Sequence, residues 1–232
     1  MATRLEKLRR ALPAATHLLA VSKGQSAAAI REAVTLGQRS FGESRLQEAI
    51  AKQRELTDLE PLDWHFIGRL QANKARGVLR HFGTLHSVDS VDLARRLQRI
   101  AAEENLTPRV FLQVKLRPDP AKTGFEPADL RAAWLELGAL VPLRVVGLMT
   151  IAPQGLSVAE RIGLFEDCAA LAAELALPEL SMGMSGDWPE AVAAGSTWVR
   201  LGTALFGARP GSETPASPGI ADQGTDPATT TP

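Results

Sequence analysis

A lysine follows a short apolar run near the beginning of the chain. Residues 17–22 have the composition of a buried strand, and Lys23 comes directly after them. A lysine amine shielded from water loses its proton more readily, and only the neutral amine forms a Schiff base with an aldehyde. Lys23 is therefore a candidate nucleophile, although its position alone favours an ordinary solvated loop lysine.

A phosphate site is predicted near residue 200. Residues 200–203, Arg-Leu-Gly-Thr, end an apolar run and precede residues 204–206, which could open a short helix. Glycine permits close backbone approach, and free N–H groups at a helix start favour an anion. Residues 181–185 add two hydroxyl groups on a neighbouring loop. The two loops together predict a phosphate cup, whereas an ordinary strand-to-helix turn remains the alternative for the first.

The remaining polar candidates are weaker. His65 could touch a bound ring, but a histidine at such a place is more often a hydrogen-bonded packing residue, and the same holds for His86. Asn73 and Lys74 fit a solvated helix start. The sequence shows no His/Cys/Asp set with metal spacing and no G-x-S-x-G motif, so metal and serine-hydrolase chemistry are not expected.

The elements that would position these residues alternate between strand and helix. Helices are expected to begin at Ser26, at the capping boxes Ser44 with Gln47 and Ser157 with Glu160, and at Pro189. The predicted strands are residues 17–22, 39–41, 64–67, 85–88, 109–114, 145–149, 180–182 and 197–201. Eight strand-helix units predict a single (β/α)8 TIM barrel of the α/β class, with functional residues at the C-terminal ends of the strands. A doubly wound parallel sheet is the alternative.

Composition sets the boundaries of this barrel. The chain has 232 residues, and residues 1–209 can bury a core as one domain. Residues 210–232 are rich in Gly, Ser, Thr, Pro, Asp and Ala, which predicts a disordered C-terminal tail. Basic and acidic residues number 26 each, so no net field favours nucleic acid or an anionic membrane.

Cellular location is predicted from cysteine content and hydropathy. The single cysteine, Cys168, cannot form an internal disulfide, which fits a reducing compartment. No apolar run approaches the roughly 20 residues that span a bilayer. We expect a soluble cytoplasmic protein.

The motifs resemble the pyridoxal-phosphate homeostasis protein family, the YggS-like proteins, which are similar to the barrel domain of alanine racemase standing alone. The resemblance covers roughly residues 5–209. The segments that carry it are residues 20–23 (Ala-Val-Ser-Lys), 41–43 (Phe-Gly-Glu), 65–68 (His-Phe-Ile-Gly), 70–71 (Leu-Gln), 73–74 (Asn-Lys), 86–88 (His-Ser-Val), 147–149 (Gly-Leu-Met), 181–185 (Ser-Met-Gly-Met-Ser), 199–200 (Val-Arg) and 202–203 (Gly-Thr).

The resemblance implies a pyridoxal 5'-phosphate (PLP) site. Lys23 would form the Schiff base, and Arg200 would face the pyridine nitrogen. Because arginine only donates hydrogen bonds, that nitrogen would stay unprotonated and the ring would be a poorer electron sink. The cofactor-binding residues expected are Lys23, His65, Met149, Ser181, Ser185, Arg200, Gly202 and Thr203, with Ser185, Gly202 and Thr203 at the phosphate.

Three positions depart from the family pattern near this site. Ser44 stands where the Phe-Gly-Glu motif is usually followed by Asn, and Lys115 where Gln-Val is usually followed by Asn. Gly24-Gln25 replaces a more usual polar pair after Lys23. Affinity and rim contacts depend on where these side chains lie.

The expected function is PLP binding in vitamin B6 homeostasis, without a catalytic reaction. We expect the protein to be a monomer that exchanges PLP with PLP-dependent apo-enzymes. A PLP-dependent amino-acid racemase is the enzymatic alternative, but alanine racemases use a tyrosine from a second domain, and this chain has no tyrosine. Cys168, the other acid of this kind, falls in a predicted helix. An interaction scaffold without cofactor is the third alternative.

Overall fold

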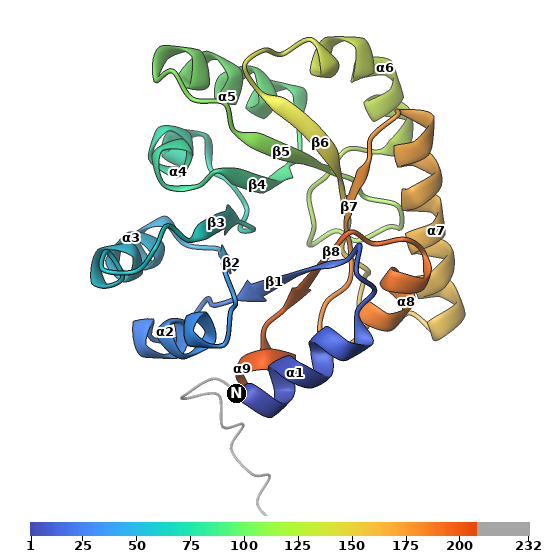
Figure 1. Ribbon diagram of the computed structural model, residues 1–232. Helices are drawn as coiled ribbons and strands as arrows, with labels where there is room; N and C mark the ends of the chain where they lie inside the picture. The colour runs from blue at the N-terminus through green and yellow to red at the C-terminus, as the bar shows by residue number, and fades with distance from the viewer. Residues whose placement is uncertain (208–232) are drawn as a thin grey trace, which may run out of the picture.

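The structure is a computed structural model that describes residues 1–207, in which eight parallel strands form a closed ring surrounded by helices (Figure 1). The strands are β1 (His17–Val21), β2 (Ser40–Glu43), β3 (Asp63–Phe66), β4 (Thr84–Val88), β5 (Arg109–Gln113), β6 (Arg144–Met149), β7 (Glu179–Ser181) and β8 (Trp198–Leu201). The helices are α1 (Ala2–Ala11), α2 (Ala27–Thr35), α3 (Leu46–Glu55), the 3-10 helix η1 (Ala72–Lys74), α4 (Ala75–His81), α5 (Val91–Glu103), α6 (Pro127–Gly138), α7 (Val158–Glu174), α8 (Trp188–Ala193) and α9 (Thr203–Phe206).

The ring closes between the first and last strands. His17 on β1 is in register with Trp198 on β8, and Ala20 with Leu201, while the other edge of β1 pairs with β2. This closure confirms the predicted TIM barrel and excludes the open doubly wound sheet. Each predicted strand overlaps an observed one. The predicted tail, residues 210–232, lies outside the described residues.

Side chains alternate between the barrel interior and the helix layer. On β1, Leu19 packs inside the barrel with Phe111 and Met149, whereas Ala20 packs outside with Ile30. Strand side chains point alternately to the two faces of a sheet. Continuing this alternation past the end of β1 places Lys23 on the inward side, at the C-terminal mouth.

Local caps fix where several helices begin. The Ser26 hydroxyl accepts a hydrogen bond from the backbone of Ala29 at the start of α2, and Ser157 forms the predicted capping box at α7. The capping box predicted at Ser44 is wrong. Ser44 lies at a bend after β2, and α3 begins after Arg45 without a side-chain cap.

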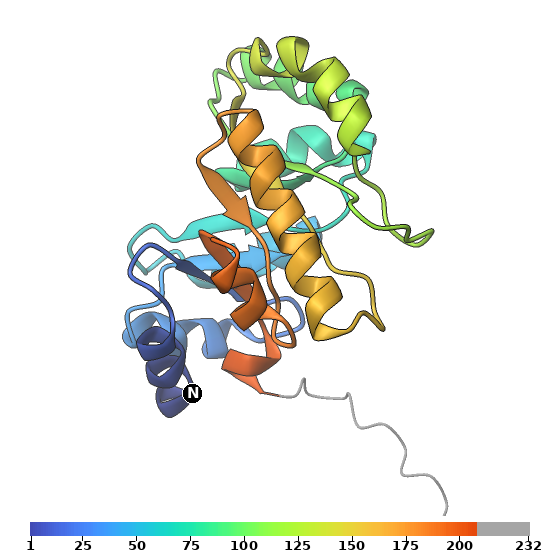
Figure 2. The ribbon, with the colours of Figure 1, turned by 90° about the vertical axis from the view of Figure 1, so that its right-hand side faces the viewer.

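The first helix contacts the last. The Arg4 guanidinium donates hydrogen bonds to the carbonyls of Leu205 (2.8 Å) and Phe206 (3.1 Å), so α1 lies against α9 (Figure 2). Leu5 and Leu8 of α1 pack in the same buried cluster as Leu205. The described part of the chain contains no helix long and apolar enough to cross a bilayer.

Candidate functional site

Several of the predicted cofactor residues follow the C-terminal ends of neighbouring strands, at the mouth of the barrel. Lys23 follows β1, and Gly202 and Thr203 follow β8, which pairs with β1. Lys23 is half-buried and Thr203 is exposed. The pairing of β1 with β8 thus brings the Lys23 segment close to the predicted phosphate loop, although the two segments are far apart in sequence.

The backbone on both sides of Lys23 is held by side chains of α3. Lys52 Nζ donates to the carbonyl oxygen of Ser22 (2.8 Å), and Gly24 N–H donates to Glu48 Oε1 (2.5 Å). Lys52 Nζ also donates to Glu48 Oε1 (2.7 Å). These bonds restrict the backbone from which the Lys23 side chain extends.

Glu43 completes this cluster from the end of β2. Its Oε1 accepts hydrogen bonds from Ser22 Oγ (2.7 Å) and Lys52 Nζ (2.7 Å), whereas its buried Oε2 has no partner in residues 1–207. Burial raises the pKa of Glu43, against the opposing effect of the bonds from Lys52 and Ser22. Burial also acts to raise the pKa of Glu48, but hydrogen bonds from Lys52 and Gly24 outweigh it, so that pKa is lowered.

Arg200 is buried in the barrel at the base of the mouth. Its Nη1 donates to the backbone oxygen (2.5 Å) and Oγ (2.8 Å) of Ser181, and Nη2 donates to the Thr150 carbonyl (2.9 Å). Burial lowers the pKa of Arg200 to about 10, so the guanidinium stays charged near neutral pH. Nε–H and one Nη2–H keep no partner in residues 1–207. The guanidinium therefore has donors beyond those bound to Ser181 and Thr150.

The two loops of the predicted phosphate cup are joined by a hydrogen bond. Ala204 N–H donates to Ser185 Oγ (3.2 Å), which links the loop after β7 to the start of α9. Gly183 permits this course, since its φ is +87° and a Cβ there would lie 2.7 Å from the Cβ of Ala191. The Thr203 hydroxyl makes no hydrogen bond within residues 1–207. The Ser185 hydroxyl is thus held at the start of α9, the short helix that begins at Thr203.

The other predicted residues lie deeper. Met149 packs in the barrel interior at the end of β6, and Ser181 ends β7 beneath Arg200. His65 is fully buried, with both ring nitrogens hydrogen-bonded inside the barrel, so it does not reach the mouth. The sequence analysis did not predict that His65 and His86 contact each other. Both residues occupy inward-facing positions on adjacent strands, and this alternation could have indicated the contact.

Two of the three family departures have defined surroundings. Lys115 Nζ forms an ion pair with Glu126 (2.9 Å). Ser44 lines a cavity of about 310 Å³ together with Arg69 and Lys74. Lys74 ends η1 and is exposed, as expected for a helix start. The positive charge of Lys115 is thus balanced by the carboxylate of Glu126.

Other kinds of chemistry find little support in the described part of the chain. Residues 1–207 contain no group of three His, Cys, Asp or Glu side chains placed to hold a metal ion. Cys168 lies in α7, as predicted, and is fully buried. Burial raises the pKa of its thiol to about 12, so this cysteine is unsuited to proton transfer at the mouth.

Sequence comparison identifies the family. Residues 1–210 match the family described as alanine racemase, N-terminal domain. The chain belongs to this family. Within it, the chain is 48% identical over 204 residues to the pyridoxal phosphate homeostasis protein of Synechocystis sp., covering 85% of this chain and 94% of the relative. The protein of the same name from Escherichia coli K12 is 40% identical over 208 residues, covering 85% and 87%.

Solved structures of family members share the barrel. PipY of Synechococcus elongatus, solved with PLP bound, is 56% identical with a TM-score of 0.86 and covers 89% of this chain and 99% of that one. Alanine racemase from Corynebacterium glutamicum has a TM-score of 0.67 at 20% identity, which shows the fold alone. This chain covers 62% of that racemase.

Proposed function

We propose that this chain is a binding protein for pyridoxal 5'-phosphate in PLP homeostasis, that it holds the cofactor through a Schiff base with Lys23, and that it has no committed catalytic reaction. The observation that carries the proposal is that Lys23 and the Gly202-Thr203 turn follow the C-terminal ends of the paired strands β1 and β8, on the strand pair that also carries the buried Arg200. PipY, at 56% identity, has been solved with PLP bound.

The residues at the mouth fit the parts of this cofactor. Arg200 would donate to the pyridine nitrogen, and Ser185, Gly202 and Thr203 would bind the phosphate through hydroxyl and backbone groups. Met149 and Ser181 form the floor of the site. His65 belongs to the same site but acts from within the barrel, without touching the cofactor.

PLP, when bound, supplies an aldehyde that reacts with primary amines and a ring that can withdraw electrons. Arg200 stays protonated at neutral pH and only donates hydrogen bonds, so it would leave the ring nitrogen unprotonated and weaken that withdrawal. Racemisation also needs an acid on the far face of the ring. The chain has no tyrosine, and Cys168 is buried in α7, so the amino-acid racemase alternative is not favoured.

We also propose that the protein works as a cytoplasmic monomer that exchanges PLP with PLP-dependent apo-enzymes. The single buried cysteine supports a reducing compartment. A site at the mouth of a barrel, with no second domain in residues 1–207, supports exchange.

The test compares the visible absorbance of PLP-treated wild type, Lys23→Ala and the matched control Lys115→Ala. We expect a band near about 420 nm in wild type and the control, and its loss in Lys23→Ala. Borohydride reduction followed by peptide mass spectrometry should place the adduct on Lys23. A colourless wild type that takes up no PLP would overturn the proposal, and racemisation of alanine by the loaded protein would favour the enzyme.

A further inference from the structure

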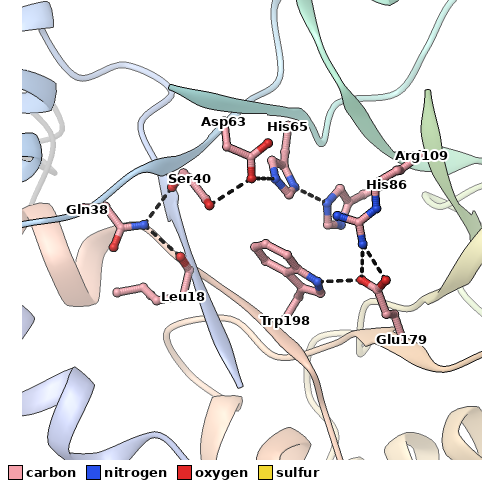
Figure 3. A network of polar contacts seen from close by, with 9 residues as sticks. All are labelled: Leu18, Gln38, Ser40, Asp63, His65, His86, Arg109, Glu179 and Trp198. Atoms are coloured by element: carbon pink, nitrogen blue, oxygen red, sulfur yellow. Dashed lines mark hydrogen bonds and ion pairs between the residues drawn. The ribbon is translucent and has the colours of Figure 1, made fainter. Parts of the chain in front are cut away.

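A chain of short hydrogen bonds runs through the barrel from Arg200 towards its N-terminal end. Arg200 Nη1 bonds to Ser181 Oγ at 2.8 Å, and that oxygen lies 2.8 Å from His86 Nδ1. His86 Nε2 lies 2.8 Å from His65 Nδ1, and His65 Nε2 lies 2.6 Å from Asp63 Oδ2. Figure 3 shows the part from His86 to Asp63 in the middle of the barrel. We call these five residues the relay.

The donor in each bond follows from the chemistry of its two ends. Arg200 can only donate, so Ser181 Oγ accepts from it. Within residues 1–207 the Ser181 hydroxyl proton has one acceptor, His86 Nδ1. His86 must then carry its proton on Nε2 and donate it to His65 Nδ1. His65 in turn carries its proton on Nε2 and donates it to the Asp63 carboxylate. Every bond therefore points from Arg200 to Asp63.

If the hydrogen bonds ran in the opposite direction, the relay would need one more proton, and the hydroxyl proton of Ser181 would have no acceptor within residues 1–207. His86 Nδ1–H would donate to Ser181, and the buried Ser181 hydroxyl proton would have no acceptor in the described chain, which costs free energy. His65 would have to be an imidazolium. Burial lowers the pKa of His86 well below its ordinary value, and the charge of Arg200 acts in the same direction, which also favours the neutral ring.

We propose that His86 and His65 are positioning residues, which hold the Ser181 hydroxyl as an acceptor and thereby orient Arg200 towards the ring nitrogen of the bound cofactor. The inference rests on the proposed function for the identity of the ligand. Hydrogen bonds in a chain polarise one another, so a serine that donates to His86 is a stronger acceptor for Arg200. Asp63, at the far end, supplies the negative charge that fixes the direction.

The groups around the relay are consistent with this direction. Ser40 Oγ also donates to Asp63 Oδ2 (3.0 Å), so this oxygen accepts two hydrogen bonds. Burial acts to raise the pKa of Asp63, but the bond from His65 and the other interactions outweigh it, and the pKa is lowered. Arg109 Nη2 is bound to Glu179 (2.6 Å), which also accepts from Trp198 Nε1 (2.9 Å).

The first test does not depend on the cofactor. Ring ¹⁵N chemical shifts of histidine-labelled protein without PLP report which nitrogen carries a proton. We expect His65 and His86 to be neutral with the proton on Nε2, and we would assign them with single-histidine variants. A proton on Nδ1 of either ring, or an imidazolium at either position near neutral pH, would overturn the proposal whether or not the protein binds PLP.

The second test measures the orientation of Arg200 through the cofactor. His86→Phe keeps the stacking on Phe111 (ring centroids 4.4 Å apart) but removes both nitrogens, whereas His86→Gln keeps one acceptor and one donor. We expect His86→Phe to shift the absorbance band of bound PLP and weaken PLP binding by about tenfold or more, the size of one lost bond to a charged group. His86→Gln should restore both.

The matched control is His81→Phe, because His81 lies at the end of α4 and bonds to Gln53 outside the relay. It should leave the band and the dissociation constant unchanged. An unchanged band in a folded His86→Phe protein that still binds PLP would contradict the proposal. If wild type binds no PLP, the proposed function fails. The ¹⁵N chemical shifts of His65 and His86 then still test the direction of the hydrogen bonds in the relay.

Discussion

Replacement of Lys52 by methionine tests the buried charge cluster behind Lys23. Lys52→Met removes three hydrogen bonds, to the Ser22 carbonyl, Glu43 and Glu48, and leaves the buried Glu43 carboxylate with only the Ser22 hydroxyl as donor. Removing one partner of a buried ion pair costs about 3–5 kcal/mol. Typical domains unfold at about 5–15 kcal/mol, so a loss of this size is easily measured.

The loss should depend on pH. The pKa of Glu43 in the folded protein is raised above its ordinary value of 4.5. Its contribution to stability is therefore fully present below that value and is lost as the pH rises through the folded pKa. Without Lys52, the pKa of Glu43 in the folded protein rises further, so stability is lost over a wider range of pH. We expect the free-energy difference between wild type and Lys52→Met to be larger at pH 8 than at pH 5.

Urea unfolding at both pH values measures these differences. Lys52→Met combined with Glu43→Gln should recover part of the stability, because no buried charge is left unpaired. Arg131→Met is the matched surface control, since its ion pair with Glu174 is exposed and contributes little. A Lys52→Met protein within about 1 kcal/mol of wild type at pH 8, or equally destabilised at both pH values, would refute the reasoning.

Three further predictions concern single positions. Cys168, whose burial raises its pKa to about 12, should resist thiol reagents at pH 8 in the folded protein and react in urea; rapid labelling of the native protein, measured by mass spectrometry, would contradict its placement. Gly183→Ala should destabilise the fold by about 1–3 kcal/mol and weaken PLP retention. Gly186→Ala in the same loop should do neither, because an added Cβ there has no atom within 4 Å. Thermal unfolding and PLP titration measure the two effects. Phe111→Ala should cost about 3–5 kcal/mol in urea unfolding, because the ring fills the barrel interior, and a cost below 1 kcal/mol would mean that the interior is loosely packed.

Much of the fold follows from local signals in the sequence. The strand runs and the caps at Ser26 and Ser157 depend on residues close together in the chain, and the structure confirms them. The capping box predicted at Ser44 is wrong because Ser44 lies at a bend, and Arg45 is the N-cap of α3. The backbone of Ser44 packs closely against Gly68, a contact that is not local in the sequence.

The site was predicted less completely than the fold. Lys23, Gly202 and Thr203 were predicted as site residues because strand ends in a barrel meet at one mouth, whereas the role of Arg200 was implied by the family resemblance, and these assignments stay predictions. The relay was not recognised, because β3, β4, β7 and β8 supply its side chains and only the closed ring places them in one interior layer. The Lys52 cluster was missed for a similar reason: a lysine on a helix is ordinarily solvated, and nothing local shows that it is buried.

The pairing of β1 with β8 has a consequence for synthesis of the protein. Lys23 leaves the ribosome early, whereas Arg200 and the phosphate loops come near the end of the barrel. At about 5–20 residues per second, the intervening stretch takes roughly 10 to 35 seconds to translate. During that interval the nascent chain has Lys23 but lacks the rest of the proposed site. Under the proposed function, only a finished barrel would therefore retain the cofactor.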